Sequence, residues 1–163
     1  MMLFSFKKIF FANNNIGDIM KIRLGYVSLP VTLNITSSKT LTLSSYKKLG
    51  KRRGEEKRLK IFDENINNLL EILKYNLNNN IHFYRMTSHL TYKDSYNNIL
   101  LKRKNKLIEI GNFIKENNMR VDIHPDQFNV LNSLNEKVVE DTISSLYYYD
   151  DLMNKLNLKT NII

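Results

Sequence analysis

Apolar residues recur at helical spacing in three stretches of the chain. The first stripe predicts a long helix that ends at Asn78 to Asn80, and its members are Phe62, Ile66, Leu69, Leu70, Leu73 and Leu77. The second predicts a helix that stops near Glu116, with an inner stripe of Leu107, Ile110, Gly111 and Ile114. A capping box of Ser133 with Glu136 predicts the start of the third. The face of this helix comprises Val139, Ile143, Leu146, Met153 and Leu156.

Strand-like segments alternate with these helices. The predicted strands are Lys21 to Leu29, stopped by Pro30, then Ile81 to Met86, Met119 to Ile123, and a fourth that begins at Thr160 to Ile163. Between the first strand and the first helix, the polar and β-branched run from Thr32 to Ser45 predicts a loop or a short hairpin. The alternating order predicts an α/β fold of parallel (β/α) units. Because a parallel barrel needs eight strands, the chain supplies about half of a TIM-type barrel, or a small open sheet.

Composition narrows the class of protein further. The chain has 163 residues, 42% of them hydrophobic, which favours one soluble globular unit. It contains no cysteine, which excludes disulfides, thiolate zinc sites and cysteine nucleophiles and is compatible with a cytoplasmic location. Ile9 to Ala12 is too short for a signal sequence or a membrane span. Because Met20 directly precedes the first predicted strand, we expect residues 1–19 to be a poorly ordered leader or a start-site artefact. The domain is then 20–163.

Net charge points to a polyanionic partner. The chain carries 25 lysines and arginines against 16 aspartates and glutamates, a net charge of +9, which favours nucleic acid as a partner. The densest cluster comprises Lys47, Lys48, Lys51, Arg52, Arg53, Lys57, Arg58 and Lys60. It either binds phosphates or is a solvated helix start with Glu55 and Glu56 as partners.

The end of the third strand carries candidate chemistry. Alternation places the apolar residues Met119, Val121 and Ile123 on one face and Arg120, Asp122 and His124 on the other. His124 is then at the carboxyl end of its strand, where α/β enzymes place their chemistry. A neutral imidazole there is a natural ligand for zinc or manganese. The alternative is a loop histidine hydrogen-bonded to the backbone. Arg85, on the second strand, reaches either a phosphate or an interior carboxylate.

Several strings then agree in order with a known family. They are "IRLGYVSLPVTLN", "TLTL", "NLLEILKYNLNNNIHFYRMTSHL", "FIKENNMRVDIHPDQFNVLNS" and the following "VVE". From Ile22 to about Ile163 the chain resembles the amino-terminal half of the UV damage endonuclease family. The resemblance implies a metal-dependent (β/α) barrel enzyme of DNA repair, which uses divalent metal ions, manganese above all, and incises damaged double-stranded DNA on the 5′ side of ultraviolet photoproducts.

The resemblance also assigns roles to single residues. His124 matches a metal-ligating histidine, and Gln127 with Phe128 matches a polar-aromatic pair pushed into the duplex at the lesion. Tyr26 matches a tyrosine that lines the lesion pocket. No residue is assigned as catalytic.

Two departures from the family pattern limit these expectations. Where the family has a second histidine ligand, Tyr92 or Tyr96 stands in this chain, and a phenol is a much poorer ligand at neutral pH. His89 is close by but matches a non-ligand position. The remaining family ligands follow the "NII" string and are absent, so the ligand set is incomplete.

We therefore expect little or no incision by this chain alone, and a missing carboxyl-terminal half or self-association of two copies. The alternatives are a non-catalytic DNA-binding fragment and another metal-dependent barrel enzyme.

Overall fold

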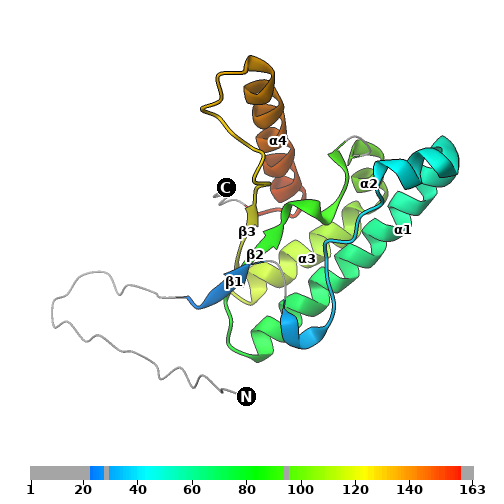
Figure 1. Cartoon of the computed structure of the whole chain (residues 1–163). Helices are drawn as coiled ribbons and strands as arrows, with labels where there is room; N and C mark the ends of the chain where they lie inside the picture. The colour runs from blue at the N-terminus through cyan, green and yellow to red at the C-terminus, as the bar shows by residue number, and fades with distance from the viewer. Residues whose placement is uncertain (1–22, 28–29, 94–95, 159–163) are drawn as a thin grey trace.

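A computed structural model describes residues 23–27, 30–93 and 96–158 (Figure 1). The strands are β1 (Gly25–Val27), β2 (Phe83–Thr87) and β3 (Arg120–His124). The helices are α1 (Leu43–Asn78), α2 (Tyr96–Lys102), α3 (Lys104–Glu116) and α4 (Glu136–Lys155), with short 3₁₀ helices η1 (Val31–Leu33) and η2 (Ser88–Leu90). The expected leader, 1–19, and the expected fourth strand, Thr160 to Ile163, lie outside the described residues.

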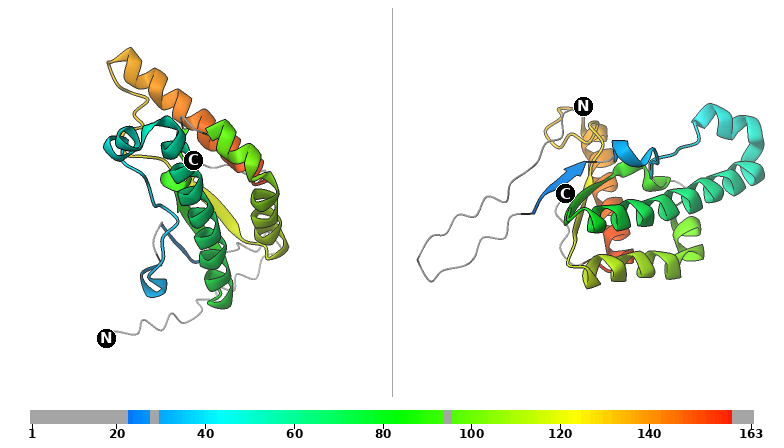
Figure 2. Two further views of the ribbon diagram at one scale, coloured as in Figure 1. Left: turned by 90° about the vertical axis from the view of Figure 1, so that its right-hand side faces the viewer. Right: turned by 90° about the horizontal axis from the view of Figure 1, so that it is seen from below.

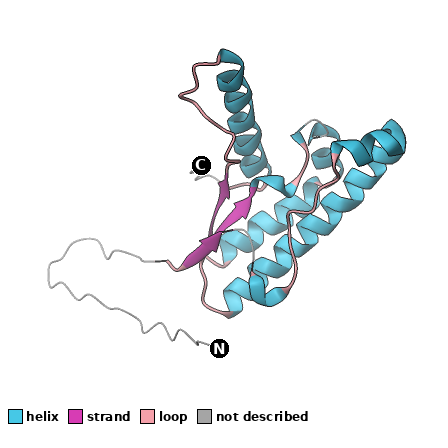
Figure 3. Ribbon diagram, viewed as in Figure 1, coloured by secondary structure: helices cyan, strands magenta, loops and turns pink. Residues whose placement is uncertain are grey.

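The three strands form one parallel sheet in the order β1-β2-β3. Its register pairs Tyr26 with Tyr84, Tyr84 with Val121, and Thr87 with His124, so the carboxyl ends of β2 and β3 meet at one edge. Helices α1 and α3 lie side by side against the sheet (Figure 3). The α/β class of parallel (β/α) units is confirmed, because each crossover between neighbouring strands contains a helix.

The predicted stripe of α1 forms the centre of the core. Phe62, Leu69 and Leu73 are fully buried against Tyr84 and Met86 of β2. Thr42 is the N-cap of α1, and its side chain accepts a hydrogen bond from the backbone N–H of Ser45. The predicted stop in the asparagine run is also confirmed, since α1 ends at Asn78.

Helices α3 and α4 pack closely at one glycine. All four residues of the predicted α3 stripe are buried. A Cβ atom at Gly111 would lie 1.7 Å from the carbonyl oxygen of Leu156, so only glycine permits this approach. Leu156 follows the last turn of α4, and the contact fixes where α4 crosses α3.

The expected start and face of α4 need correction. Asn135 is the N-cap and its side chain accepts from the backbone N–H of Lys137 at 3.0 Å, whereas Ser133 only accepts from the N–H of Asn135. Ile143 is exposed instead of buried. Tyrosines displace the buried face, because Tyr148 and Tyr149 are buried in the core cluster while Tyr147 remains exposed.

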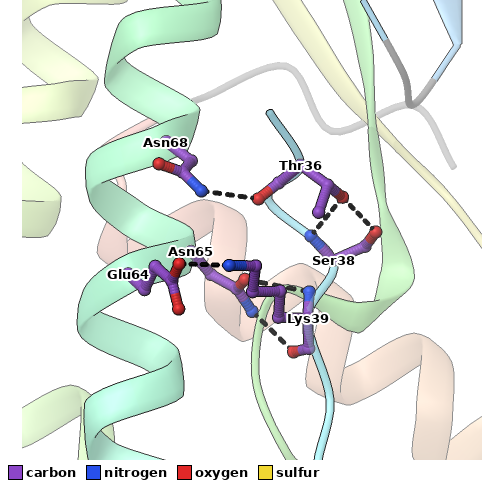
Figure 4. A network of polar contacts seen from close by, with 6 residues as sticks. All are labelled: Thr36, Ser38, Lys39, Glu64, Asn65 and Asn68. Carbon is purple, nitrogen blue, oxygen red and sulfur yellow. Dashed lines mark hydrogen bonds and ion pairs between the residues drawn. The ribbon is translucent and has the colours of Figure 1, made fainter. Parts of the chain in front are cut away.

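The run from Thr32 to Ser45 forms the end of η1, a loop and the first residues of α1, without the hairpin that was one of two expectations. Side chains of α1 bind its backbone in place of a partner strand (Figure 4). Asn65 accepts from the N–H of Lys39 and donates to the carbonyl of the same residue, both at 2.9 Å, and Asn68 donates to the carbonyl of Thr36 at 2.8 Å. Helix α2 is a further element that the apolar periodicity did not predict.

Candidate functional site

His124 is the last residue of β3 and its side chain is exposed. Alternation along the strand places it on the same face as Asp122, opposite the buried Val121 and Ile123. Its strand partner is Thr87, the last residue of β2. The imidazole is therefore at the carboxyl edge of the sheet, as the strand pattern predicted.

Two residues before His124, on the same face of β3, Asp122 binds Arg85. The guanidinium donates from Nε to Oδ1 at 2.9 Å and from a terminal nitrogen to Oδ2 at 3.3 Å. Asp122 is only 1% exposed, and its hydrogen bond raises the pKa of Arg85 above the ordinary value, with its charge as a second cause. Of the two partners expected for Arg85, the structure gives the interior carboxylate.

The loops after β2 and β3 bring His89 and Asp126 together. His89 Nε2 lies 3.6 Å from Asp126 Oδ2, and His89 Nδ1 is 3.2 Å from Ser88 Oγ. Both side chains come from loops at the carboxyl edge that carries His124. The two residues are 37 positions apart in the sequence, and the parallel pairing of β2 with β3 brings them together.

Asp126 also shapes the loop that carries the predicted polar-aromatic pair. Its Oδ1 accepts from the backbone N–H of Phe128 at 3.2 Å, and its carbonyl accepts from the N–H of Asn129 at 3.0 Å. This Asx-type turn holds Gln127 at its tip. Both Gln127 and Phe128 are exposed, and Phe128 retains 75% of its surface in solvent.

Sequence reasoning missed two further features of this loop. Leu131 and Leu134 are also exposed, so the loop carries an apolar surface larger than Phe128 alone. Thr142 of α4 anchors the loop: its hydroxyl accepts from the N–H of Val130 at 2.9 Å and donates to the carbonyl of Val138 at 2.7 Å. Leucines within a polar loop were the available signal, but no local pattern indicates Thr142.

Tyr26 lies elsewhere on the sheet. Its ring centroid is 5.3 Å from that of Tyr84, and its hydroxyl donates to Asn76 Oδ1 on α1 at 2.7 Å. Burial is the main cause that raises the pKa of Tyr26. In this structure Tyr26 faces α1, on the side of the sheet opposite Arg85 and Asp122. Its assignment to a lesion pocket stays a prediction.

Tyr92 is engaged away from His124. Its hydroxyl accepts from the backbone N–H of Leu41, and its ring lies 4.7 Å from the guanidinium of Arg58. The side chain of Tyr96 is outside the described part of the structure.

Among residues 23–27, 30–93 and 96–158, no group of three or more histidine, aspartate or glutamate side chains could hold a metal ion. The described residues thus provide individual donors at the edge, without a complete metal site. Within the same ranges, no helix has both the length and the apolarity needed to cross a membrane.

Comparison with known proteins identifies the family. A family model described as UV-endonuclease UvdE matches residues 22–163. The chain belongs to this family. A UV DNA damage endonuclease of Clostridium perfringens is 32% identical over 148 residues, and a UV DNA damage endonuclease of Halalkalibacterium halodurans is also 32% identical over 148 residues. The alignments cover 87% and 85% of this chain.

A solved structure of the UvdE family has the same fold. The crystal structure of SacUVDE matches with a TM-score of 0.74 and 37% identity over 85% of this chain. The match covers 47% of that chain, 34% of the clostridial relative and 45% of the Halalkalibacterium relative. This chain therefore spans less than half the length of these relatives.

Proposed function

We propose that this UvdE-family chain takes part in the repair of ultraviolet-damaged double-stranded DNA, in an enzyme that incises the strand on the 5′ side of the photoproduct. The observation that carries the proposal is the exposed Gln127–Phe128 pair, presented by an Asx-type turn beside His124 at the carboxyl edge of the sheet. The ring of Phe128, positioned by this turn, can take the place of a base in the stack of the duplex.

The energetics favour a damaged site over an intact one. Stacking of a base on an aromatic side chain contributes about 1–3 kcal/mol. Extruding a nucleotide costs less where pairing is already weakened by damage. Phe128 and Gln127 are thus proposed to contact the lesion, with Tyr26 as a further lesion-binding residue from the family resemblance.

We propose His124 as one ligand of a divalent metal site, with manganese as the preferred ion. Each divalent cation needs several protein ligands to exceed its hydration. His89 and Asp126 are donors on the loops at the same edge, yet with His124 they do not form a metal-binding group among the described residues. We therefore expect these 163 residues alone to incise DNA little or not at all.

The open side of β3 is the place for the rest of the site. Within the described residues β3 pairs with β2 along one edge only. We propose that further strands, from additional chain or from a second copy, cover the other edge and supply the missing ligands. Sedimentation of the purified chain tests the second source: a monomer at all concentrations would exclude self-association.

Binding and incision assays test the proposal. We expect tighter binding to a duplex with one photoproduct than to the undamaged duplex, and Phe128→Ala should lose about tenfold of this preference. Tyr147→Ala is the matched control, because Tyr147 is an aromatic residue with a similar exposure of 73% but lies on α4. Equal binding to both duplexes would refute the proposal.

A non-catalytic role in DNA binding is the second candidate, favoured by the incomplete set of described ligands. It predicts that a chelator leaves DNA binding unchanged. Adding manganese and irradiated plasmid, with an intact relative as positive control, separates the two candidates: robust nicking by this chain would contradict both its expected inactivity and the non-catalytic role.

A further inference from the structure

The amino-terminal part of α1 carries the strongest charge in the sequence, and the structure sorts its residues into three groups. From Lys47 to Lys60 there are eight cationic residues and two glutamates. Arg58 faces inward, and Arg52 forms an ion pair with Glu56 at 3.7 Å. The other six cations are exposed, and none of the ion pairs among the described residues includes them. They are Lys47, Lys48, Lys51, Arg53, Lys57 and Lys60.

Three of these exposed cations, Arg53, Lys57 and Lys60, form one stripe on the helix. Their spacings of four and three residues place them on a common face, about 100° around the helix from the inward-facing Gly54, Arg58 and Ile61. Like charges at these spacings repel one another and destabilise a helix. The stripe therefore adds nothing to the stability of the isolated fold, and an anionic partner would remove the repulsion.

The stripe is held rigidly, unlike a flexible basic tail. The guanidinium of Arg58 lies between two aromatic rings, 4.0 Å from the centroid of Tyr46 and 4.7 Å from that of Tyr92. Glu55 accepts from the Tyr46 hydroxyl at 2.6 Å and lies 3.5 Å from Arg58. Cation–π contacts are stronger when the guanidinium is desolvated, and Arg58 is buried. The inner face of this segment is thus tied to the loop that follows β2.

A backbone break makes the clamp possible. Tyr46 and Arg58 are twelve residues apart and would lie about 18 Å apart along an unbroken helix. Gly50 has φ 73° and ψ 163°, a conformation essentially restricted to glycine. This interruption lets the first turn fold back so that Tyr46 contacts both Gly54 and Arg58.

The stripe also lies toward the edge that carries His124. Asn65 of α1 donates to the carbonyl of Leu90, next to His89, at 3.1 Å. At 1.5 Å per residue, Lys60 lies about 7 Å and Arg53 about 18 Å farther along the helix axis from this contact. Figures 1 and 2 show that this first part of α1, in cyan, projects away from the sheet.

From this arrangement we propose that Arg53, Lys57 and Lys60 form a phosphate-binding surface for duplex DNA that flanks the lesion. The inference rests on the proposed function for its DNA partner, but it concerns a different surface. The stripe spans about 10 Å, a length over which a duplex presents about six phosphate charges. The contact is independent of base sequence and of damage, and it places the duplex across the carboxyl edge.

The test compares two triple variants that remove the same charges. In the stripe variant, Arg53→Gln, Lys57→Gln and Lys60→Gln are combined. In the control, Arg23→Gln, Lys74→Gln and Lys115→Gln remove three exposed cations near the amino-terminal ends of the strands and the carboxyl-terminal turns of α1 and α3. Binding to damaged and undamaged duplexes is measured by fluorescence anisotropy over a salt series, and circular dichroism checks folding.

Three phosphate contacts contribute about 2.7 to the slope of log affinity against log salt. The stripe variant should lose this part of the slope, so that its affinity changes about 40-fold less than that of the wild type between about 50 and about 200 mM salt. The control should keep the wild-type slope. The ratio of affinities for damaged and undamaged DNA should stay unchanged in both variants.

The possible failures are distinguishable. An unchanged slope in the stripe variant, or an equal loss in the control, overturns the phosphate-binding surface even if damaged DNA is preferred. A stripe-dependent slope without any preference for damage supports the surface and refutes the proposed function. No binding to either duplex refutes both. A stripe effect seen with anionic lipid vesicles but not with DNA refutes the phosphate-binding surface alone.

Discussion

Two polar pairs, one within β2 and β3 and one on the segments that follow these strands, differ in burial and in geometry. Inside the sheet, Arg85 and Asp122 form two hydrogen bonds, and the carboxylate is buried. At the carboxyl edge, His89 and Asp126 are 3.6 Å apart and more exposed, with the exposed His124 nearby on the end of β3. The inner pair satisfies its own charges, whereas the edge leaves donor atoms accessible to a ligand. We therefore expect stability to depend on the inner pair, and we propose that binding depends on the edge.

Removing the inner carboxylate should have the largest effect. Asp122→Ala leaves Arg85 without its partner, and breaking a buried pair costs about 3–5 kcal/mol. We expect the lower end of this range, because the Arg85 side chain is 35% exposed. Urea denaturation measures the loss, with the exposed Asp141→Ala as control. If the two variants had the same stability, the Arg85–Asp122 pair would contribute no more to stability than an exposed carboxylate does.

Alkaline pH should weaken the core on the other face of the sheet, where Tyr84 packs against Tyr26. Burial raises the pKa of Tyr84 to about 12 from its ordinary value of 10. Between these values the unfolded chain releases the phenolic proton and the folded chain retains it, so stability is complete below pH about 10 and falls as pH rises toward about 12. The loss approaches about 3 kcal/mol.

Urea denaturation at several alkaline pH values measures this dependence, and Tyr84→Phe should remove most of it. Tyr147→Phe is the control, since Tyr147 is exposed. The same pH dependence in wild type and Tyr84→Phe would assign the effect to another group.

A methyl group added between α3 and α4 should lower the free energy of unfolding by an intermediate amount. Gly111→Ala forces the backbone at Leu156 to move, and overpacking of this kind costs about 1–3 kcal/mol. Thermal unfolding would measure it. Asn112→Ala, at the exposed neighbouring position, should remain within about 0.5 kcal/mol of the wild type. A stable Gly111→Ala protein would mean that the two helices separate without cost.

Substitutions at the edge should have the smallest effect on stability. His124→Ala and Phe128→Ala remove exposed side chains, and each should change the free energy of unfolding by at most about 0.5 kcal/mol. Binding of the damaged duplex should nevertheless decrease for Phe128→Ala. A destabilisation of more than about 2 kcal/mol for His124→Ala would make this histidine a structural residue, comparable to Asp122.

Prediction from sequence was most accurate where burial follows a local period. The α3 stripe is buried as expected, and so is the α1 stripe except for the half-buried Leu77, because an apolar residue every third or fourth position defines one helix face whatever the partner is. Alternation in β3 likewise placed His124 at the strand end. It was less accurate for α4, where the tyrosines shift the buried face, and it missed α2.

The candidate site was only partly accessible to the same reasoning. The motif around His124 indicated Gln127 and Phe128, and both are exposed beside it. No sequence pattern indicated that Asp126 would face His89, or that Thr142 would hold the loop through Val130. These contacts join side chains on different elements, and their spacing along the chain carries no periodic signal.

The sequence by itself determined the order of parallel units, the main buried stripes, the excess of positive charge and the family. Tertiary structure decided which charges are neutralised: Arg85 by Asp122, Arg52 by Glu56, and Arg58 by Glu55 and two aromatic rings, while Arg53, Lys57 and Lys60 have no ion-pair partner among the described residues. The physical reason is that periodicity fixes the direction of a side chain relative to its own helix or strand. Its partners depend on the register of β2 with β3 and on the backbone break at Gly50, which bring distant residues into contact.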